Sequence, residues 1–272
     1  MDRNLMKLNQ YTIVIRGAGE MASGIAFRLF KSNFKRICMT EVSQPLAVRR
    51  AVSFCEAVHE GEKTVSGVTA KLVEGYDRIQ KTWEEEAIPV IMDPEARVID
   101  FLKPEVVIDA IMAKKNLGTK ITDAALVIGV GPGFHAGMDT HMVVETNRGH
   151  NLGRVIYDGE AERDTGLPGA IGGYTVERVF RAPKNGQIRL KRAIGDLTET
   201  GDVVAEVDGL QVLSRIGGVI RGMVKDGTHV SEGMKIGDVD PRGVGEYCYT
   251  VSDKTLAIAG GALEAILSRF NC

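Results

Sequence analysis

Residues 129–153 read GVGPGFHAGMDTHMVVETNRGHNLG and combine histidine, acidic side chains and an arginine with many glycines. Imidazole and carboxylate groups can exchange protons near neutral pH and can also bind zinc or iron. The glycines allow tight turns and a close approach of the backbone to a ligand. No HExxH or similar ligand spacing occurs, so metal binding is left open, and histidines that only hydrogen-bond a turn would explain the segment equally well. The candidate catalytic residues are Asp139, His141, Glu145, Arg148 and His150.

A second glycine-rich stretch, GAGEMA at residues 17–22, follows an apolar segment predicted to be a strand and precedes a segment predicted to be a helix. It matches the GxGxxG/A pattern of dinucleotide-binding loops, in which the glycines admit a phosphate and the amides of the first helical turn face it. Glu41 ends the next apolar segment, where an acid could accept the hydroxyls of a ribose. The same scaffold without a bound nucleotide is the alternative. The candidate cofactor-binding residues are Arg16, Gly17, Gly19, Ala22, Gly24, Glu41, Gly131 and Gly133.

Further apolar segments would position these two loops. Residues 88–93, 106–112 and 125–130 are rich in aliphatic side chains and are predicted to be strands, with a predicted helix at 94–102. Strands that alternate with helices predict an α/β fold with a parallel sheet. We therefore expect a Rossmann-like nucleotide-binding or cofactor-binding domain over residues 1–150. Both glycine-rich loops should lie at the carboxyl edge of its sheet.

The carboxyl half contains an internal repeat. Gly186–Asp208 aligns without a gap on Gly218–Asp240, a shift of 32 residues that matches several glycines and the closing Val-Asp pair. Two copies of one strand–turn–strand unit predict a small all-β module over residues 151–245. The glycine spacing resembles that of biotinyl and lipoyl domains, which implies a barrel-sandwich fold. Those domains carry a modifiable lysine between their halves, whereas residues 208–214 contain none, so we expect no covalent biotin or lipoate. Residues 246–272 are expected to form a C-terminal helix that packs back on the first domain.

The bulk properties exclude several classes of partner. The chain has 272 residues, 34 Lys and Arg against 36 Asp and Glu, and a formal net charge of −2. Such a balance gives no general attraction to nucleic acid or to an anionic membrane. The apolar runs are too short to span a bilayer, and MDRNLMKLNQ lacks the apolar core of a signal peptide. The four cysteines, at 38, 55, 248 and 272, form no CxxC pair, so we expect a reducing compartment and a cytoplasmic protein.

Several long strings, among them VIRGAGEMASGIAFRLF, GVGPGFHAGMDTHMVVETNRGHNLGRVIYDG and SDKTLAIAGGALEAIL, resemble the YqeB family, and the resemblance covers nearly the full chain. That family comprises accessory proteins of selenium-dependent molybdenum hydroxylase systems, distantly similar in their Rossmann part to the XdhC/CoxI maturation factors. The resemblance implies a maturation role in which the protein handles the molybdenum pterin cofactor or its terminal sulfur or selenium ligand. It also implies a molybdenum hydroxylase apoenzyme as partner. It transfers no catalytic role to a particular residue.

Two alternatives use the same residues differently. An NAD(P)-dependent oxidoreductase would bind its cofactor through the glycine loop and Glu41, and would exchange protons through His141 or His150. A non-enzymatic assembly scaffold would hold the hydroxylase through the β module and would need no small ligand. A nucleotide or a pterin dinucleotide is the ligand expected from the glycine loop, and the sequence leaves open whether a reaction is catalysed.

Overall fold

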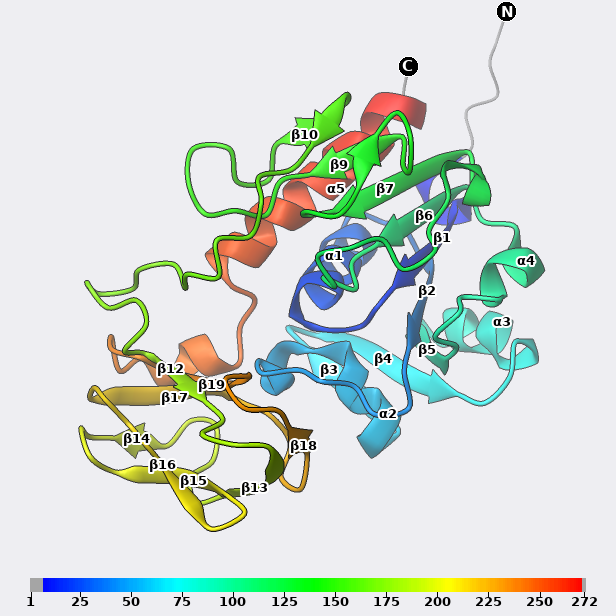
Figure 1. Cartoon of the computed structure of the whole chain (residues 1–272). Coiled ribbons are helices and arrows are strands. Elements are labelled where there is room, and N and C mark those ends of the chain that lie inside the picture. The colour runs from blue at the N-terminus through cyan, green and yellow to red at the C-terminus, as the bar shows by residue number, and fades with distance from the viewer. Residues whose placement is uncertain (1–6, 271–272) are drawn as a thin grey trace, which may run out of the picture. The chain divides into compact units, whose positions relative to one another are not determined.

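The computed structural model describes residues 7–270, and its contacts divide the chain into two compact units (Figure 1). Unit 1 comprises Met1–Pro45, Ser53–Asp164 and Val251–Cys272, and unit 2 comprises Leu46–Val52 and Thr165–Thr250. Each unit has its own hydrophobic core. Both units are therefore assembled from pieces that are separated in the sequence.

A mixed nine-stranded sheet forms the centre of unit 1. Its strands are β1 (Thr12–Arg16), β2 (Arg36–Glu41), β3 (Glu62–Val65), β4 (Val68–Val73), β5 (Ile88–Met92), β6 (Val106–Asp109), β7 (Leu126–Val130), β9 (Met142–Val144) and β10 (Val155–Ile156). The order is β10-β9-β7-β6-β1-β2-β5-β4-β3, and the neighbours from β9 to β4 are parallel. The edge strands β3 and β10 are antiparallel to their neighbours. The central strands are short, apolar and buried, as expected of strands that are covered on both faces.

Helices cover both faces of this sheet (Figure 1). The helices of unit 1 are α1 (Glu20–Lys31), α2 (Ala57–Glu60), α3 (Asp77–Glu84), α4 (Val98–Leu102) and α5 (Asp253–Phe270). Helices α1 and α5 pack so closely that a Cβ on Gly24 would lie 1.9 Å from Cγ2 of Thr255. Helices α3 and α4 cover the other face, where Trp83 and Val98 join a core cluster with Val14. A two-stranded ladder, β8 (His135–Ala136) and β11 (Gly159–Glu160), lies outside the main sheet.

Two four-stranded sheets form unit 2. One contains β12 (Val179–Arg181), β19 (Lys235–Asp240), β17 (Gly218–Met223) and β14 (Leu197–Thr198), and the other contains β16 (Leu210–Leu213), β15 (Val203–Val207), β13 (Gly186–Leu190) and β18 (His229–Val230), each in that order. The shift of 32 residues makes β13 equivalent to β17, β14 to β18 and β15 to β19. Each short strand pairs with the long strand of the other copy, β14 with β17 and β18 with β13. The two copies of the repeat are therefore interlocked.

The predicted fold class is wrong. We expected a Rossmann-like parallel sheet domain followed by a biotinyl/lipoyl-like barrel-sandwich module. The large sheet is instead mixed, because β3 and β10 close its edges in antiparallel orientation. Unit 2 consists of two sheets that include β12, which lies outside the repeat, and it also takes in residues 46–52 from the amino-terminal half. A local strand–loop–helix motif and a local repeat do not determine which further strands complete a sheet.

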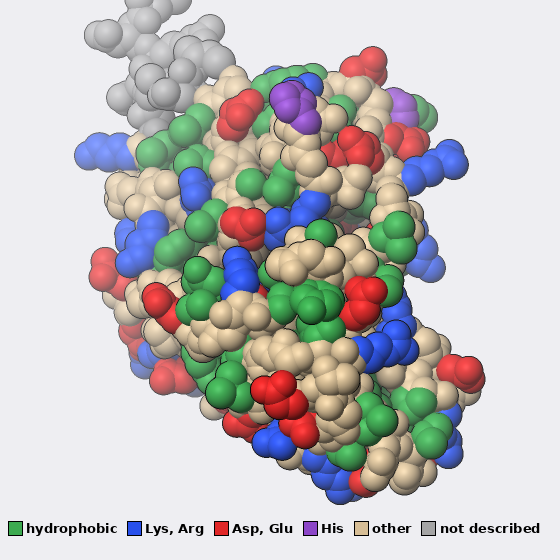
Figure 2. Space-filling model, turned by 90° about the vertical axis from the view of Figure 1, so that its left-hand side faces the viewer, with side chains coloured by type: hydrophobic (Ala, Val, Ile, Leu, Met, Phe, Trp, Pro, Cys, Tyr) green, Lys and Arg blue, Asp and Glu red, His purple; other side chains and the backbone are tan. Residues whose placement is uncertain are grey.

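Three further expectations concern membranes, cysteines and surface charge. No helix within residues 7–270 has both the length and the apolar character that crossing a bilayer requires. Cys38, Cys55 and Cys248 are buried, whereas Cys272 lies outside the described residues. On the face drawn in Figure 2, basic and acidic side chains are interspersed. That face therefore presents no large area of a single sign of charge.

Candidate functional site

The carboxyl ends of the parallel strands bring distant segments of unit 1 to one edge of the sheet. Strands β1, β2 and β6 end at Arg16, Glu41 and Asp109, and the glycine loop 17–19 follows β1 directly. Ligands of open α/β sheets bind outside this edge, where the loops leave the strands. This edge is therefore the candidate site.

The loop after β1 leaves the start of helix α1 open. Gly17 has a φ of +89°, and its amide donates to the carbonyl oxygen of Thr40 at 2.9 Å. Gly19 is the N-cap residue of α1 and supplies no capping side chain, and a Cβ built there would meet no described atom within 4 Å. The first amides of a helix lack intrahelical acceptors and carry the positive end of its dipole. The arrangement can therefore bind a phosphate or another anion.

Glu41 lies beside this loop at the end of β2. Its Oε2 accepts a hydrogen bond from the amide of Ala18 at 2.9 Å, and its Oε1 accepts one from the amide of Val42 at 2.8 Å. Burial raises the pKa of Glu41 more than these two backbone hydrogen bonds lower it. The carboxyl group thus fixes the loop, and its remaining lone pairs can accept hydroxyl groups of a sugar.

Arg16 is buried and organises the neighbouring loop. Its guanidinium forms an ion pair with Asp109 at 3.3 Å, and it donates to the carbonyl oxygen of Leu117 at 3.0 Å and to the hydroxyl of Thr119. Thr119 donates in turn to Asp109 at 2.6 Å. These bonds hold residues 109–119 against β1. The observed partners of Arg16 are thus protein groups that order the loop after β6.

Ala22 and Gly24 lie in α1 and contribute to helix packing. Both are buried, and Gly24 faces Thr255 of α5. Glu20, in the first turn of α1, accepts hydrogen bonds from the hydroxyls of Ser252 at 3.2 Å and Thr255 at 3.4 Å. The acidic side chain of the first turn is therefore held against the start of α5.

The loop after β6 is strained beside the glycine loop. Met112 and Lys114 have left-handed φ angles of +64° and +61°. Such a backbone in a non-glycine residue costs on the order of 1–3 kcal/mol, and it is often found at ligand sites. Gly133 permits a close approach to this loop, because a Cβ there would lie 2.6 Å from Cα of Lys115. The sequence MAKKN carries no signal for this strain, and sequence reasoning missed the loop.

Strand β9 divides the five candidate catalytic residues into two groups. Asp139 and His141 precede β9, on the amino side, whereas Glu145, Arg148 and His150 follow it, on the carboxyl side. His141 and Glu145 are four residues apart in the sequence, but this spacing does not show that β9, which lies between them, has only three residues. The structure therefore does not bring all five side chains together.

The two residues before β9 bond to the backbone. Oδ2 of Asp139 accepts from the amide of His135 at 2.9 Å, and Nδ1 of His141 accepts from the amide of Val127 at 3.0 Å. Burial lowers the pKa of His141, and the charge of Arg269 lowers it further. His141 is thus favoured as a neutral imidazole whose Nδ1 is already occupied. Both residues stabilise the local chain.

Glu145 is an anchored carboxylate at the end of β9, with only 2% of its surface exposed. Its Oε1 accepts from the amides of Thr146 at 2.6 Å and Asn147 at 2.7 Å, and its Oε2 accepts from the amide of Glu162 at 2.7 Å. Gly131 makes room for the same turn, because a Cβ there would lie 2.7 Å from Oγ1 of Thr146. Glu145 therefore orders the loop that carries Arg148.

Arg148 is the predicted catalytic residue that lies beside the start of α5. Its guanidinium forms two hydrogen bonds with the carboxylate of Asp253, at 2.9 and 3.1 Å. The preceding residue, Ser252, bonds to Glu20 of α1, so the start of α5 contacts both Arg148 and the first turn after the glycine loop. His150 is exposed. Within residues 7–270, no group of three or more His, Cys, Asp or Glu side chains could hold a metal ion.

A hollow of about 730 Å³ opens at the ends of β4 and β5. Its walls come from residues 73–76, 91–95 and 97. The hydroxyl of Tyr76 donates to Oδ2 of Asp93 at 3.3 Å. Burial raises the pKa of Tyr76, and Asp93 adds to this effect. Sequence reasoning missed this cavity, because two segments that are distant in the sequence form it.

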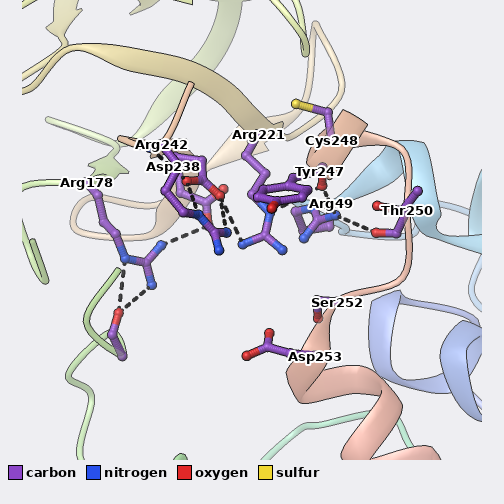
Figure 3. A network of polar contacts seen from close by, with 12 residues as sticks. Arg49, Arg178, Arg221, Asp238, Arg242, Tyr247, Cys248, Thr250, Ser252 and Asp253 are labelled. Atoms are coloured by element: carbon purple, nitrogen blue, oxygen red, sulfur yellow. Dashed lines mark hydrogen bonds and ion pairs between the residues drawn. The ribbon is translucent and has the colours of Figure 1, made fainter. Parts of the chain in front are cut away.

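A second cluster of polar side chains lies in unit 2 and contains four arginines (Figure 3). Nη2 of Arg49 donates to the carbonyl oxygens of Tyr247 at 3.0 Å and Thr250 at 3.3 Å. Nε of Arg221 donates to the same carbonyl of Tyr247 at 3.4 Å. Nε and Nη2 of Arg178 donate to the carbonyl oxygen of Gly169 at 3.1 and 2.9 Å. These bonds tie together segments of unit 2 that are far apart in the sequence.

Two buried aspartates of β19 are the acidic members of this cluster. Asp240 accepts from Nε and Nη2 of Arg242 at 2.8 and 2.6 Å, and Arg221 lies 3.7 Å away. Burial alone would raise the pKa of Asp240, but its hydrogen bonds with Arg242 and the charges of Arg242 and Arg221 hold it below the usual range. Asp238 pairs with Arg178 at 3.5 Å. The cluster is a structural network of unit 2, and the repeat pattern marked only Asp240.

Comparison with known proteins identifies one close relative. The chain is 49% identical over 255 residues to the Escherichia coli (strain K12) protein named Uncharacterized protein YqeB, and the alignment covers 94% of this chain and 47% of that protein. The chain therefore spans about half the length of the curated relative that it matches. No protein-family model matches the chain. The similarity over nearly the full chain supports the YqeB family.

Similarities to solved structures are weaker. An aspartoacylase family protein from Mesorhizobium loti is 9% identical, with a TM-score of 0.25 over 75% of this chain and 55% of that chain. TcdA (CsdL) is 13% identical, with a TM-score of 0.31 over 97% of this chain and 90% of that chain. TM-scores this low do not establish a shared fold. No activity is therefore transferred from these proteins.

Proposed function

We propose, from the relationship to YqeB, that this chain is an accessory protein in the maturation of a selenium-dependent molybdenum hydroxylase. In this proposal unit 1 holds a phosphate-bearing cofactor, a molybdenum pterin or its dinucleotide, for the hydroxylase apoenzyme. The maturation role is what the resemblance to the YqeB family implies. Because the chain matches about half of its relative, the activity of the longer protein is part of the same proposal.

The observation that carries the cofactor proposal is the open start of helix α1. Gly19 offers neither a capping side chain nor a Cβ, and the space at its Cβ position is free of described atoms within 4 Å. The pyrophosphate of a dinucleotide would accept hydrogen bonds from the first amides of α1, and Glu41 would accept ribose hydroxyls. When bound, the cofactor would supply the molybdenum-ligating pterin, while the residues of this chain bind and orient it.

The direct test is a titration of the Gly19→Val variant. The added side chain would occupy the place that an anion must approach, so we expect at least tenfold weaker binding of NADH, NADPH or CDP, about 1.4 kcal/mol. Gly245→Val is a matched control, because a Cβ at Gly245 also meets no described atom within 4 Å and lies in unit 2. Equal affinities of the folded Gly19→Val variant and the wild type would refute the proposed binding site.

A cellular experiment tests the maturation role. Arg148 lies on the carboxyl side of β9 and is connected to α1 through the start of α5, whereas His141 lies on the amino side and bonds to the backbone. We therefore expect Arg148→Ala to lower hydroxylase activity in cells, while His141→Asn retains it. Full hydroxylase activity with Arg148→Ala would remove this residue from the proposed site. Full activity in cells that lack the protein would refute the maturation role.

An NAD(P)-dependent oxidoreductase is the second candidate, because the glycine loop and Glu41 would serve NAD(P) equally well. His141 is unsuited to be its proton carrier, since its Nδ1 accepts from Val127 and it lies on the amino side of β9. Mass spectrometry of small molecules that copurify with the protein separates the candidates. A pterin would support the maturation role, and NAD(P) would support the oxidoreductase. Binding of the hydroxylase without any small ligand would favour an assembly scaffold.

A further inference from the structure

We infer that the hollow at the ends of β4 and β5 binds the planar ring system of the ligand whose phosphates lie at the glycine loop. This inference rests on the proposed function and adds a second subsite to it. The volume of about 730 Å³ is within the usual range of small-molecule sites. All of its lining residues belong to unit 1, as does the glycine loop.

The position of the hollow fits the reach of a nucleotide. Strand β2 separates β5 from β1, and adjacent strands are about 4.8 Å apart, so the hollow begins about 10 Å from the glycine loop. Glu41 lies between them: it bonds to Ala18 of the loop, and its carbonyl oxygen accepts from the amide of Asp93 at 3.0 Å. A phosphate at the loop, a ribose at Glu41 and a ring in the hollow therefore follow one path along the sheet edge.

The lining of the hollow suits a flat heterocycle. Tyr76, Met92 and Pro94 offer apolar surfaces, and Asp93 offers an acceptor for the ring edge. Nε and Nη2 of Arg97 donate to Glu95 at 2.9 and 2.6 Å, so Nη1 of Arg97 is the donor that it offers to a ring. The side chain of Tyr76 is held in position, because its hydroxyl donates to Asp93. Asp93 also accepts from the amide of Val98 at 2.8 Å, which anchors its carboxylate at the start of α4. The site is therefore largely preformed.

Apolar side chains remain accessible around this hollow. Met92 is 46% exposed at the end of β5, and Phe101 is 58% exposed with its ring 5.2 Å from that of Tyr76. Exposed apolar groups beside a concave, partly polar site are typical of places where a ligand covers them. A ring that enters the hollow would bury part of this apolar surface.

The test fills the hollow without changing the glycine loop. Met92→Trp would add a large side chain at a lining residue that is already half exposed. Met138→Trp is the matched control, because Met138 is 68% exposed and does not line the hollow. Calorimetry would measure the binding of NADH, CDP and inorganic pyrophosphate to the wild type, to both tryptophan variants and to Gly19→Val. Circular dichroism would verify that each variant is folded.

We expect Met92→Trp to weaken the binding of NADH and CDP at least tenfold and to leave the binding of pyrophosphate unchanged. Gly19→Val should weaken the binding of all three probes, and Met138→Trp should weaken the binding of none. Wild-type affinity of Met92→Trp for NADH and CDP, with binding lost in Gly19→Val, would overturn the ring subsite and leave the proposed function standing. Loss of pyrophosphate binding in Met92→Trp would also overturn it. Failure of the wild type to bind any of the three probes would refute the phosphate site at the glycine loop, which the proposed function includes, while the maturation role itself is tested separately by hydroxylase activity in cells that lack the protein.

Discussion

Replacing Gly24 by alanine tests how closely helices α1 and α5 must pack. The added Cβ would lie 1.9 Å from Cγ2 and 3.3 Å from Cβ of Thr255, and 3.4 Å from Cγ1 of Val251. Thr255 has no exposed surface, and its hydroxyl bonds to Ser252 and Glu20, so its methyl group cannot rotate away without breaking these bonds. The two helices must therefore separate slightly.

The expected magnitude follows from two opposing effects. Overpacking of a buried contact costs about 1–3 kcal/mol, whereas alanine is favoured over glycine inside a helix by about 1 kcal/mol. We expect Gly24→Ala to lower the free energy of unfolding by about 1–2 kcal/mol, since the 1.9 Å contact is far too short to relax by a small shift. Thr255→Ser removes the obstructing methyl group and keeps the hydroxyl, at a cost of about 1 kcal/mol.

A double-mutant cycle in urea gives the decisive measurement. Trp83 is the single tryptophan of the chain and lies in unit 1, so its fluorescence reports the unfolding of the unit that contains both helices. The double variant Gly24→Ala/Thr255→Ser should lose less free energy of unfolding than the two single variants lose together, by at least about 1 kcal/mol. Gly260→Ala in α5 is the control, because its Cβ would approach only Arg28, at 3.9 Å, and it should not destabilise. Additive effects in the cycle would refute the steric explanation.

Three further predictions concern charged groups. The pKa of His141 is below its usual 6.5, so its stabilising contribution to folding is complete above pH 6.5 and decreases as the pH falls below that value. His141→Asn should remove this part of the pH dependence of the free energy of unfolding. An unchanged pH profile of unfolding in the variant would contradict the prediction. Arg148 and Asp253 are partly exposed, so a double-mutant cycle should give a coupling below about 1 kcal/mol, and a larger value would show that the pair is effectively buried. Asp240→Asn should destabilise unit 2 by about 3 kcal/mol in hydrogen exchange of β17 and β19, because it leaves the buried guanidinium of Arg221 without its carboxylate, whereas Arg242 is 45% exposed and can be solvated. Wild-type protection would contradict this role. Since the pKa of Asp240 is lowered, its stabilisation is present above the ordinary carboxyl pKa and is lost as the pH falls through the lowered value.

The elements that sequence predicted correctly are those with local signals. The strand before the glycine loop is β1, and helix α1 begins at Glu20 directly after Gly19, because apolar patterning, glycine and helix propensity all act within a few residues. The repeat likewise located equivalent strands in unit 2. The predicted strand at 106–112 is shorter than expected, since the chain leaves the sheet after Asp109 and enters the strained turn at Met112.

The parts that sequence did not reveal depend on contacts between distant segments. Nothing near Arg16 indicates that its guanidinium pairs with Asp109 instead of facing a phosphate. The spacing of His141 and Glu145 does not show that a three-residue strand places them on opposite sides. The antiparallel edge strands and the entry of residues 46–52 into unit 2 are likewise set by tertiary packing. A hydrophobic pattern defines a strand but not its neighbours.

The interleaving of the two units constrains the order in which they can be completed during synthesis. Unit 2 needs residues 46–52, whose Val48 carbonyl accepts from the amide of Met223 at 2.8 Å, and these residues emerge from the ribosome long before the rest of that unit. Unit 1 needs α5, which is synthesised last among the described elements, so its first strands must wait for all of unit 2 to be made. Domains usually finish folding in the order of synthesis. Here the amino-terminal residues belong to the unit that is finished second, and the glycine loop acquires its support from α5 only after unit 2 has been translated.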